Sequence, residues 1–238
     1  MIIHHACGSS ISSIVTFCFL LKLVITLVQA ICPSSQDIKP CTCDDEGLQC
    51  LSLNNSGLER VFKAPAERKA IRRVWIFQTN LTSLPKSAFG DYIIRDLYLD
   101  LNQIRRIEFG AFGEASKTLQ SLSLTRNQLE NFPFQDLAQM KRLRQLGLGF
   151  NKLRTIESNA FPASENLESI DLSHNQIDKI EANAFSNLNQ VSLLDLSRNQ
   201  LRSIESKTLL VKSSAKHLAV CINFFLSIIC LPDDRRIN

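Results

Sequence analysis

Few residues of this sequence could carry out catalysis. His174 lies in the run Asp171-Leu-Ser-His-Asn, which brings together a carboxylate, a hydroxyl and an imidazole, the groups of a nucleophilic triad. The Asp-Leu-Ser run recurs from Asp195 without a histidine, which favours a solvated His174 over a catalytic one. The sequence has no Gly-x-Ser-x-Gly, His-Glu-x-x-His or phosphate-binding glycine loop. We therefore expect no catalytic residues, no cofactor and no enzyme activity of the chain's own.

Four cysteines could instead form disulfides or bind a metal. Cys32, Cys41, Cys43 and Cys50 form a close group near the start of the chain. A zinc site usually has cysteine pairs separated by roughly two to four residues, whereas a single residue separates Cys41 from Cys43, and no histidine lies close by. A cysteine group of this kind is typical of disulfides in secreted proteins. We expect disulfides here and no metal site.

The first 30 residues have the pattern of a signal peptide. Residues 14–28 are almost wholly apolar and lead into Val28-Gln29-Ala30, whose outer positions suit signal peptidase, so cleavage is expected after Ala30. Lys22 interrupts the apolar run, and no Lys or Arg precedes it. An uncleaved anchor helix is the alternative, but the run is short for a membrane span. The pattern predicts secretion into the extracellular space.

Without residues 1–30 the chain has 26 basic and 23 acidic side chains, a net charge of +3. This excess does not indicate nucleic-acid binding, which requires a concentrated basic face. The clearest local excess of basic side chains lies between Arg60 and Arg73. We interpret it as a solvated rim of the molecule; the alternative is a binding site for an anionic, sulfated polysaccharide. Its basic residues are Arg60, Lys63, Arg68, Lys69, Arg72 and Arg73, with Glu59 and Glu67 among them.

The elements that position these side chains follow from an internal repeat of about 24 residues. In the unit that starts at Leu143, apolar residues recur at Leu146, Leu148 and Leu153, with Asn151 between the last two. Seven units start 23, 23, 25, 24, 24 and 24 residues apart, at Leu48, Ile71, Ile94, Leu119, Leu143, Leu167 and Val191. The first unit is the weakest; it runs through Leu51, Leu53 and Ser56.

The pattern Leu-x-x-Leu-x-Leu-x-x-Asn-x-Leu-x-x-Leu over residues 48–209 resembles the extracellular "typical" leucine-rich-repeat family. Its alternating Leu-x-Leu segment is a short strand, because alternate side chains of a strand face opposite ways. No unit can bury its apolar face alone, so units must stack and their strands must align in one parallel sheet. The resemblance implies an α/β fold: a curved leucine-rich-repeat solenoid of seven to eight repeats, with parallel strands on the concave face.

The resemblance also assigns two sets of scaffold residues. One is an internal asparagine ladder, in which each side chain bonds backbone groups that would otherwise be buried without partners. The other is a row of phenylalanines packed along the convex side. The ladder comprises Asn102, Asn127, Asn151, Asn175 and Asn199, and the row comprises Phe89, Phe112, Phe161 and Phe185.

Both ends of a solenoid need a covering element. The resemblance implies that residues 31–50 are an N-terminal cap with the pairs Cys32–Cys43 and Cys41–Cys50, and that the repeats occupy residues 48–214. Residues 215–238 are expected to be a degenerate eighth repeat, with Leu218, Val220 and Asn223 on the template, or a truncated tail. Cys221 and Cys230 in this segment have no partner in the template, so they either pair together or stay free.

The outward strand positions follow from the same register. Trp75 and Tyr98 take the middle outward position on neighbouring strands. The side chains around them are Arg73, Phe77, Arg95 and Asp96, and Phe150 lies further along the sheet. Exposed aromatic rings beside arginine are the side chains that anchor interfaces. The expected partner-binding residues are Arg73, Trp75, Phe77, Arg95, Tyr98 and Phe150.

Two glycosylation sequons lie beside these residues, at Asn54-Asn-Ser and Asn80-Leu-Thr. The repeat register gives Asn54 the outward position of Phe77 one strand earlier, so a glycan there would compete with a partner. Asn80 lies past its strand, on the rim, where a glycan would block nothing.

The resemblance implies a secreted protein that binds an extracellular protein ligand on its concave face. The runs Cys32-Pro and Pro40-Cys-Thr-Cys also resemble arthropod secreted repeat proteins, among them the non-catalytic subunit of a shrimp luciferase. One alternative is a truncated ectodomain of a cell-surface receptor or adhesion protein, for which residues 217–231 are the only candidate anchor. Another is a non-catalytic subunit of a secreted enzyme complex. Neither nucleic acid nor a membrane is expected as a partner.

Overall fold

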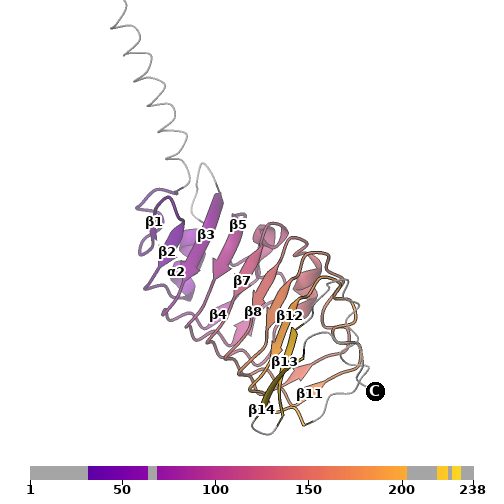
Figure 1. Cartoon of the computed structure of the whole chain (residues 1–238). Coiled ribbons are helices and arrows are strands. Elements are labelled where there is room, and N and C mark those ends of the chain that lie inside the picture. Colours follow the sequence, from indigo (N-terminus) through magenta and orange to yellow (C-terminus); the bar gives the residue numbers. More distant parts are fainter. Residues whose placement is uncertain (1–31, 64–68, 203–218, 225–226, 232–238) are drawn as a thin grey trace, which may run out of the picture.

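The computed structural model of the chain describes residues 32–63, 69–202, 219–224 and 227–231 (Figure 1). The signal peptide predicted for residues 1–30 lies outside these residues, as do Arg68 and Glu67 of the basic group.

A ten-stranded sheet forms one layer of the solenoid, and its strands follow one another in sequence order (Figure 1). Eight strands run parallel, and an antiparallel partner flanks them at each end. This confirms the expected α/β leucine-rich-repeat solenoid. The strands are β1 (Thr42–Cys43), β2 (Leu48–Cys50), β3 (Ala70–Ile76), β5 (Ile93–Tyr98), β7 (Ser121–Ser123), β8 (Gln145–Gly147), β10 (Ser169–Asp171), β12 (Leu193–Leu196), β13 (Ala219–Phe224) and β14 (Ser227–Leu231).

The interior repeats have the register that the sequence predicts. From β3 to β12 each template residue lies opposite its equivalent on the next strand; for example, Leu122 pairs with Leu146 and Ile170 with Leu194. The inward side chains of these strands are at most 2% exposed. Burying a side chain of this size contributes about 1.5–3 kcal/mol, so a slip in register would be costly at every repeat.

The opposite layer consists of short elements. Four two-residue strands form two parallel pairs: β4 (Ser83–Leu84) with β6 (Arg106–Ile107), and β9 (Thr155–Ile156) with β11 (Lys179–Ile180). The helices of this layer are α2 (Asn55–Lys63), η1 (Gly113–Lys117) and η2 (Phe134–Ala138).

The predicted phenylalanine row packs between these layers. Ring centroids lie 6.2 Å apart for Phe89 and Phe112, and 5.2 Å apart for Phe161 and Phe185. In the repeat between these pairs, Phe134 lies 5.0 Å from Phe161. The template placed Leu137 at that position; Leu137 is also buried, but the ring comes from three residues earlier.

The asparagine ladder is present as predicted. Asn151 is 6% exposed, and its Nδ2 donates to the carbonyl oxygens of Leu124 and Leu148 at 3.0 and 3.1 Å. Its Oδ1 accepts from the backbone N–H of Leu129 at 3.0 Å. The side chain therefore satisfies backbone groups of its own repeat and of the preceding one, which are shielded from water. The same contacts recur at Asn127, Asn175 and Asn199. Asn102 also donates to the preceding repeat, at the carbonyl oxygen of Ile76, but its Oδ1 accepts from the backbone N–H and the hydroxyl of Thr79, the residue that replaces asparagine in that repeat.

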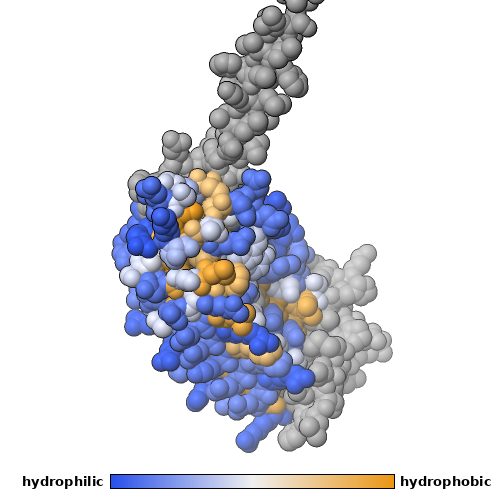
Figure 2. Space-filling view, turned by 90° about the vertical axis from the view of Figure 1, so that its left-hand side faces the viewer, coloured by the Kyte–Doolittle hydropathy of each residue, from blue (hydrophilic) through white to orange (hydrophobic). Residues whose placement is uncertain are grey.

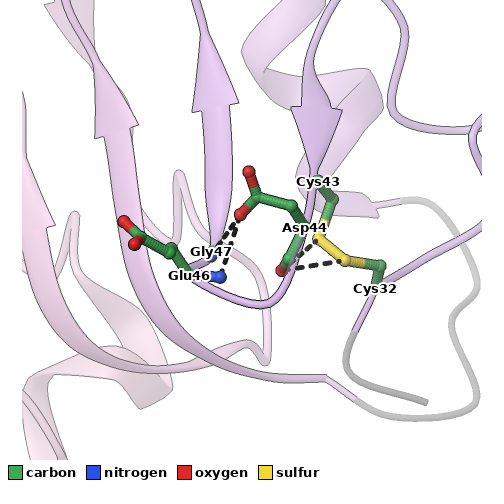
Figure 3. The surroundings of a disulfide bond; sticks show 5 residues. All are labelled: Cys32, Cys43, Asp44, Glu46 and Gly47. Carbon is green, nitrogen blue, oxygen red and sulfur yellow. Dashed lines mark hydrogen bonds between the residues drawn. A yellow bond between two sulfur atoms is a disulfide. The ribbon is translucent and has the colours of Figure 1, made fainter. Parts of the chain in front are cut away.

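The N-terminal cap contains both predicted disulfides, Cys32–Cys43 and Cys41–Cys50. Strands β1 and β2 form an antiparallel hairpin, and the Asp44 carboxylate holds its turn by accepting from the backbone N–H groups of Glu46 and Gly47 at 2.9 and 3.1 Å (Figure 3). The cap thereby joins the sheet as its first strands.

The register of the first repeat differs from the prediction. Leu48 pairs with Val74, whereas the template placed Leu51 there, and Leu51 is 56% exposed. Cys50, drawn inward by its disulfide with Cys41, takes the second inward position opposite Ile76. The covalent bond and the short hairpin fix this strand, and they overrule the leucine pattern.

The register of the eighth strand also differs. Val220 of β13 pairs with Leu194, whereas the 24-residue step placed Leu218 there. The chain then turns back, and β14 pairs antiparallel with β13. An eighth parallel strand therefore exists, but a hairpin follows it where a further repeat would need a turn and a return segment.

Candidate partner-binding surface

Two aromatic rings stack on the outward side of neighbouring strands. Trp75 and Tyr98 are paired residues of β3 and β5, and their ring centroids lie 6.1 Å apart with planes 14° from parallel. Both side chains are half-buried. The guanidinium of Arg73 lies 5.9 Å from the Trp75 ring centroid, within reach of a cation–π contact. The alternation of β3 causes this arrangement, because Val74 and Ile76 face the core and leave Arg73 and Trp75 on the sheet surface.

A buried carboxylate holds the arginines beside these rings. Asp96 pairs with Arg73 in the ladder and is only 4% exposed. Its Oδ2 accepts a hydrogen bond from Nε of Arg95 at 3.2 Å and lies 3.7 Å from Nε of Arg73. Two guanidinium groups thus share one carboxylate, so the group keeps a net positive charge. We call Arg73, Trp75, Phe77, Arg95, Asp96 and Tyr98 the aromatic–arginine patch.

The structure adds one apolar residue that the sequence register missed. Because Cys50 pairs with Ile76, the next residue, Leu51, lies alongside Phe77 rather than in the core. Leu51 is exposed and Phe77 is half-buried. Figure 2 shows apolar residues gathered on part of one face of the molecule, among the hydrophilic residues that cover most of it.

The patch ends at Tyr98. The next residues in its row are Ser123 and Gly147, followed by Asp171 and Asp195. Large outward side chains are therefore confined to the N-terminal strands of this row, and the C-terminal strands present carboxylates.

Phe150 belongs to a different row. It follows β8 in a left-handed conformation (φ 56°), as His174 does after β10. The two rings stack with centroids 3.7 Å apart, and the guanidinium of Arg126 lies 4.4 Å from the Phe150 centroid on the preceding repeat. The sequence predicted Phe150 as an exposed ring but not this column. The 24-residue repeat could have revealed it, because the three residues occupy the same template position.

His174 is half-buried, and its ring stacks on that of Phe150. Burial lowers the pKa of His174, and the positive charge of Arg198 lowers it further, against the opposing carboxylates of Asp171 and Asp195, so the neutral imidazole is favoured. The Asp171 carboxylate accepts from the backbone N–H of Ser173 at 2.8 Å, which is a local turn contact.

Of the two sequons, only Asn80 lies where it was expected. Asn54 is not opposite Phe77: it precedes α2, and its Oδ1 accepts from the backbone N–H of Gly57 at 2.8 Å, as an N-cap residue does. A glycan at Asn54 would therefore stand at the start of α2 and not over the patch. Asn80 is exposed just beyond β3, as predicted.

The basic group is partly neutralised within the protein. Lys63 forms an ion pair with Glu59, and Lys69 binds both carboxylate oxygens of Asp91 at 2.6 and 2.8 Å. Arg60 donates to the carbonyl oxygen of Lys39 at 2.8 Å. Among the residues that the structure describes, no cluster of His, Cys, Asp or Glu could hold a metal ion.

Known proteins match this chain in part. The leucine rich repeat family matches residues 94–153 and 141–201. The Oplophorus-luciferin 2-monooxygenase non-catalytic subunit of Oplophorus gracilirostris is 28% identical over 120 residues, 47% of this chain and 33% of that protein. Leucine-rich repeat-containing protein 3B of Mus musculus is 26% identical over 123 residues, 51% of this chain and 46% of that protein. The chain thus spans less than half the length of either relative.

Among solved structures, the TLR13–ssRNA13 complex contains a similar chain. The TM-score is 0.46 at 23% identity, over 68% of this chain and 26% of that chain. The family matches, the stacked parallel strands and the asparagine ladder together show that the chain belongs to the leucine-rich-repeat family.

Proposed function

We propose that this chain is an extracellular binding module whose concave sheet binds a protein partner through the aromatic–arginine patch. One observation carries the proposal: the stacked Trp75 and Tyr98 rings lie beside two arginines that share the buried carboxylate of Asp96. Tryptophan, tyrosine and arginine are the side chains most enriched among residues that dominate binding energies.

Contacts within the patch restrain its side chains. Asp96 fixes Arg73 and Arg95, and the two rings restrict each other. A side chain that is already ordered loses less conformational entropy on binding, roughly 0.5–1.5 kcal/mol less for each long side chain. The positive charge beside apolar rings favours a partner that presents acidic and apolar side chains together.

The extracellular location rests on the cap. Both disulfides lie in a small hairpin, and such bonds persist in oxidising compartments. Within the residues that the structure describes, no helix is long and apolar enough to cross a membrane. The part of residues 217–231 that is described, which was the candidate anchor of the receptor alternative, forms strands β13 and β14.

A second role, as the non-catalytic subunit of a secreted enzyme complex, draws support from one relative. The protein of Oplophorus gracilirostris is named as a non-catalytic subunit. In that role the chain would bind a catalytic partner and perform no reaction itself. An anionic polysaccharide has less support as a ligand, because Lys63 and Lys69 already pair with carboxylates.

The experiment compares four versions of the chain as bait for proteins of the secreting tissue: wild type, Trp75→Ala, Tyr98→Ala and Phe109→Ala. Phe109 is a matched control, because it is 66% exposed and follows β6 in the opposite layer. Mass spectrometry identifies the captured protein, and surface plasmon resonance then measures its affinity. We expect each patch variant to lose about 2 kcal/mol or more, roughly 30-fold in affinity, with an unchanged melting temperature. A partner that binds both patch variants as tightly as the wild type would rule the patch out.

A further inference from the structure

The two ends of the sheet are built alike. At the N-terminal end β1 and β2 form an antiparallel hairpin in which Thr42 lies opposite Gln49. One step outward along the same ladder, Cys41 comes opposite Cys50, and these two residues are disulfide-bonded with their Cα atoms 4.3 Å apart. A cross-strand disulfide therefore closes the first hairpin of the sheet.

At the other end β13 and β14 form the second antiparallel hairpin of the sheet. Its ladder places Cys221 directly opposite Cys230. Residues opposite each other on antiparallel strands have Cα atoms about 4.5–5.5 Å apart, and disulfides join residues whose Cα atoms are about 4.4–6.8 Å apart. The backbone register thus meets the distance requirement of a disulfide without any rearrangement.

We propose that Cys221 and Cys230 form a third disulfide, which closes the β13–β14 hairpin as a C-terminal counterpart of the cysteine cap. The reaction is a thiol–disulfide exchange with a small-molecule disulfide such as oxidised glutathione. The two thiols lose their protons and join in a sulfur–sulfur bond, and the two electrons reduce the small-molecule disulfide to two thiols.

The bond has a structural purpose at this position. β13 continues the parallel sheet by pairing with β12, and β14 covers the far edge of β13. An isolated two-stranded hairpin is only marginally stable, and the edge of a repeat array exposes unpaired backbone groups. A cross-strand bond restricts the unfolded hairpin and so keeps β13 and β14 in place against β12.

Peptide mapping of the full chain, folded in a glutathione redox buffer and alkylated before digestion, tests the bond directly. Trypsin is unsuitable because no Lys or Arg lies between Cys221 and Cys230, whereas chymotrypsin cleaves after Phe224 and Phe225 and separates them. We expect a non-reduced peptide pair that joins Cys221 to Cys230. The cap disulfides serve as the internal control for oxidation. Alkylated Cys221 and Cys230 beside intact cap disulfides, or bonds from either cysteine to another chain, would overturn the proposal.

Serine variants test the role of the bond. In folded protein, Cys221→Ser should expose a reactive thiol at Cys230 that the wild type lacks, and the double variant with Cys230→Ser should label at neither position. Hydrogen exchange then reports the consequence: the amides of β12 should exchange faster in the double variant, while those of β5 stay unchanged. Unchanged exchange in β12 would show that the bond does not protect the sheet, and equal thiol labelling in wild type and Cys221→Ser would show that no bond forms.

Discussion

Replacing Asn151 with alanine removes one rung of the ladder. The side chain donates to the carbonyl oxygens of Leu124, Leu148 and Gly149 at 3.0–3.2 Å, and it accepts from the N–H of Leu129 at 3.0 Å. Alanine makes none of these bonds. The Leu129 N–H then remains buried without an acceptor, since Leu129 is 0% exposed. A buried backbone donor left unpaired costs about 1–3 kcal/mol. The carbonyl oxygens add a smaller penalty, so we expect a loss of about 2–4 kcal/mol.

Urea unfolding followed by circular dichroism measures this loss. The control must be an asparagine off the template, and Asn159 is unsuitable because its φ of 54° would strain alanine for a separate reason. Asn131 is exposed and lies outside the left-handed positions, so Asn131→Ala should change the unfolding free energy by less than about 0.5 kcal/mol. Equal losses for Asn151→Ala and Asn131→Ala would refute the ladder as a source of stability.

Asn151→Asp separates the donor from the acceptor. The aspartate carboxylate can still accept the hydrogen bond from the Leu129 N–H. Its second oxygen, however, places negative charge against the carbonyl oxygens to which the Asn151 Nδ2 donates. Burial and these carbonyls should raise the pKa of the new carboxyl in the folded state. The folded variant would then hold its proton more tightly than the unfolded one, so its stability should rise as the pH falls through the raised pKa. A variant that gains nothing on acidification, relative to wild type, would show that the donated bonds do not matter.

Three further predictions concern other parts of the molecule. Phe161→Ala should cost about 3–5 kcal/mol in urea unfolding, because Phe161 is fully buried between neighbouring rings, whereas Phe109→Ala should cost little. Gly47→Ala should lower the melting temperature by an amount that matches a loss of about 2 kcal/mol or more, because φ is 148° and a Cβ would lie 2.1 Å from the carbonyl oxygen of Arg73. Burial raises the pKa of Asp100 above its ordinary value of 3.8, against the opposing hydrogen bonds that it accepts. Its ionisation therefore lowers stability as the pH rises through the raised pKa, and Asp100→Asn should remove that fall when unfolding free energies at acidic and neutral pH are compared.

The interior of the fold could be predicted from the sequence because each interior repeat packs between two repeats of the same kind. Leu122, Leu146 and Ile170 face the same core from the same template position, so one alignment fixes all their partners. The ladder asparagines were predictable for the same reason. The outward positions could be predicted because side chains alternate between the two faces of a strand. For this reason Trp75 and Tyr98 were correctly placed side by side.

The ends could not be predicted in this way, because an end strand has a repeat on one side only. At β2 the other neighbour is β1, and the Cys41–Cys50 bond rather than leucine spacing decides which side chains face the core. At β13 the other neighbour is the antiparallel β14. At both ends the spacing to the adjacent parallel strand is 26 residues, longer than every interior step. A template built on interior spacing therefore fails where a hairpin replaces a repeat.

The error at the first strand changes the interpretation of the binding surface. In the template register Asn54 lay beside Phe77, so that a glycan and a partner excluded each other. In the observed register the neighbour of Phe77 is Leu51, and Asn54 caps α2. Glycosylation at Asn54 and binding at the patch are thus compatible, and the surface gains an exposed leucine next to its aromatic residues. Because Leu51 directly follows Cys50, the cap disulfide that fixes β2 also fixes this edge of the patch. Reduction of Cys41–Cys50 should consequently weaken partner binding as well as the fold, and Leu51→Ala should weaken binding alone.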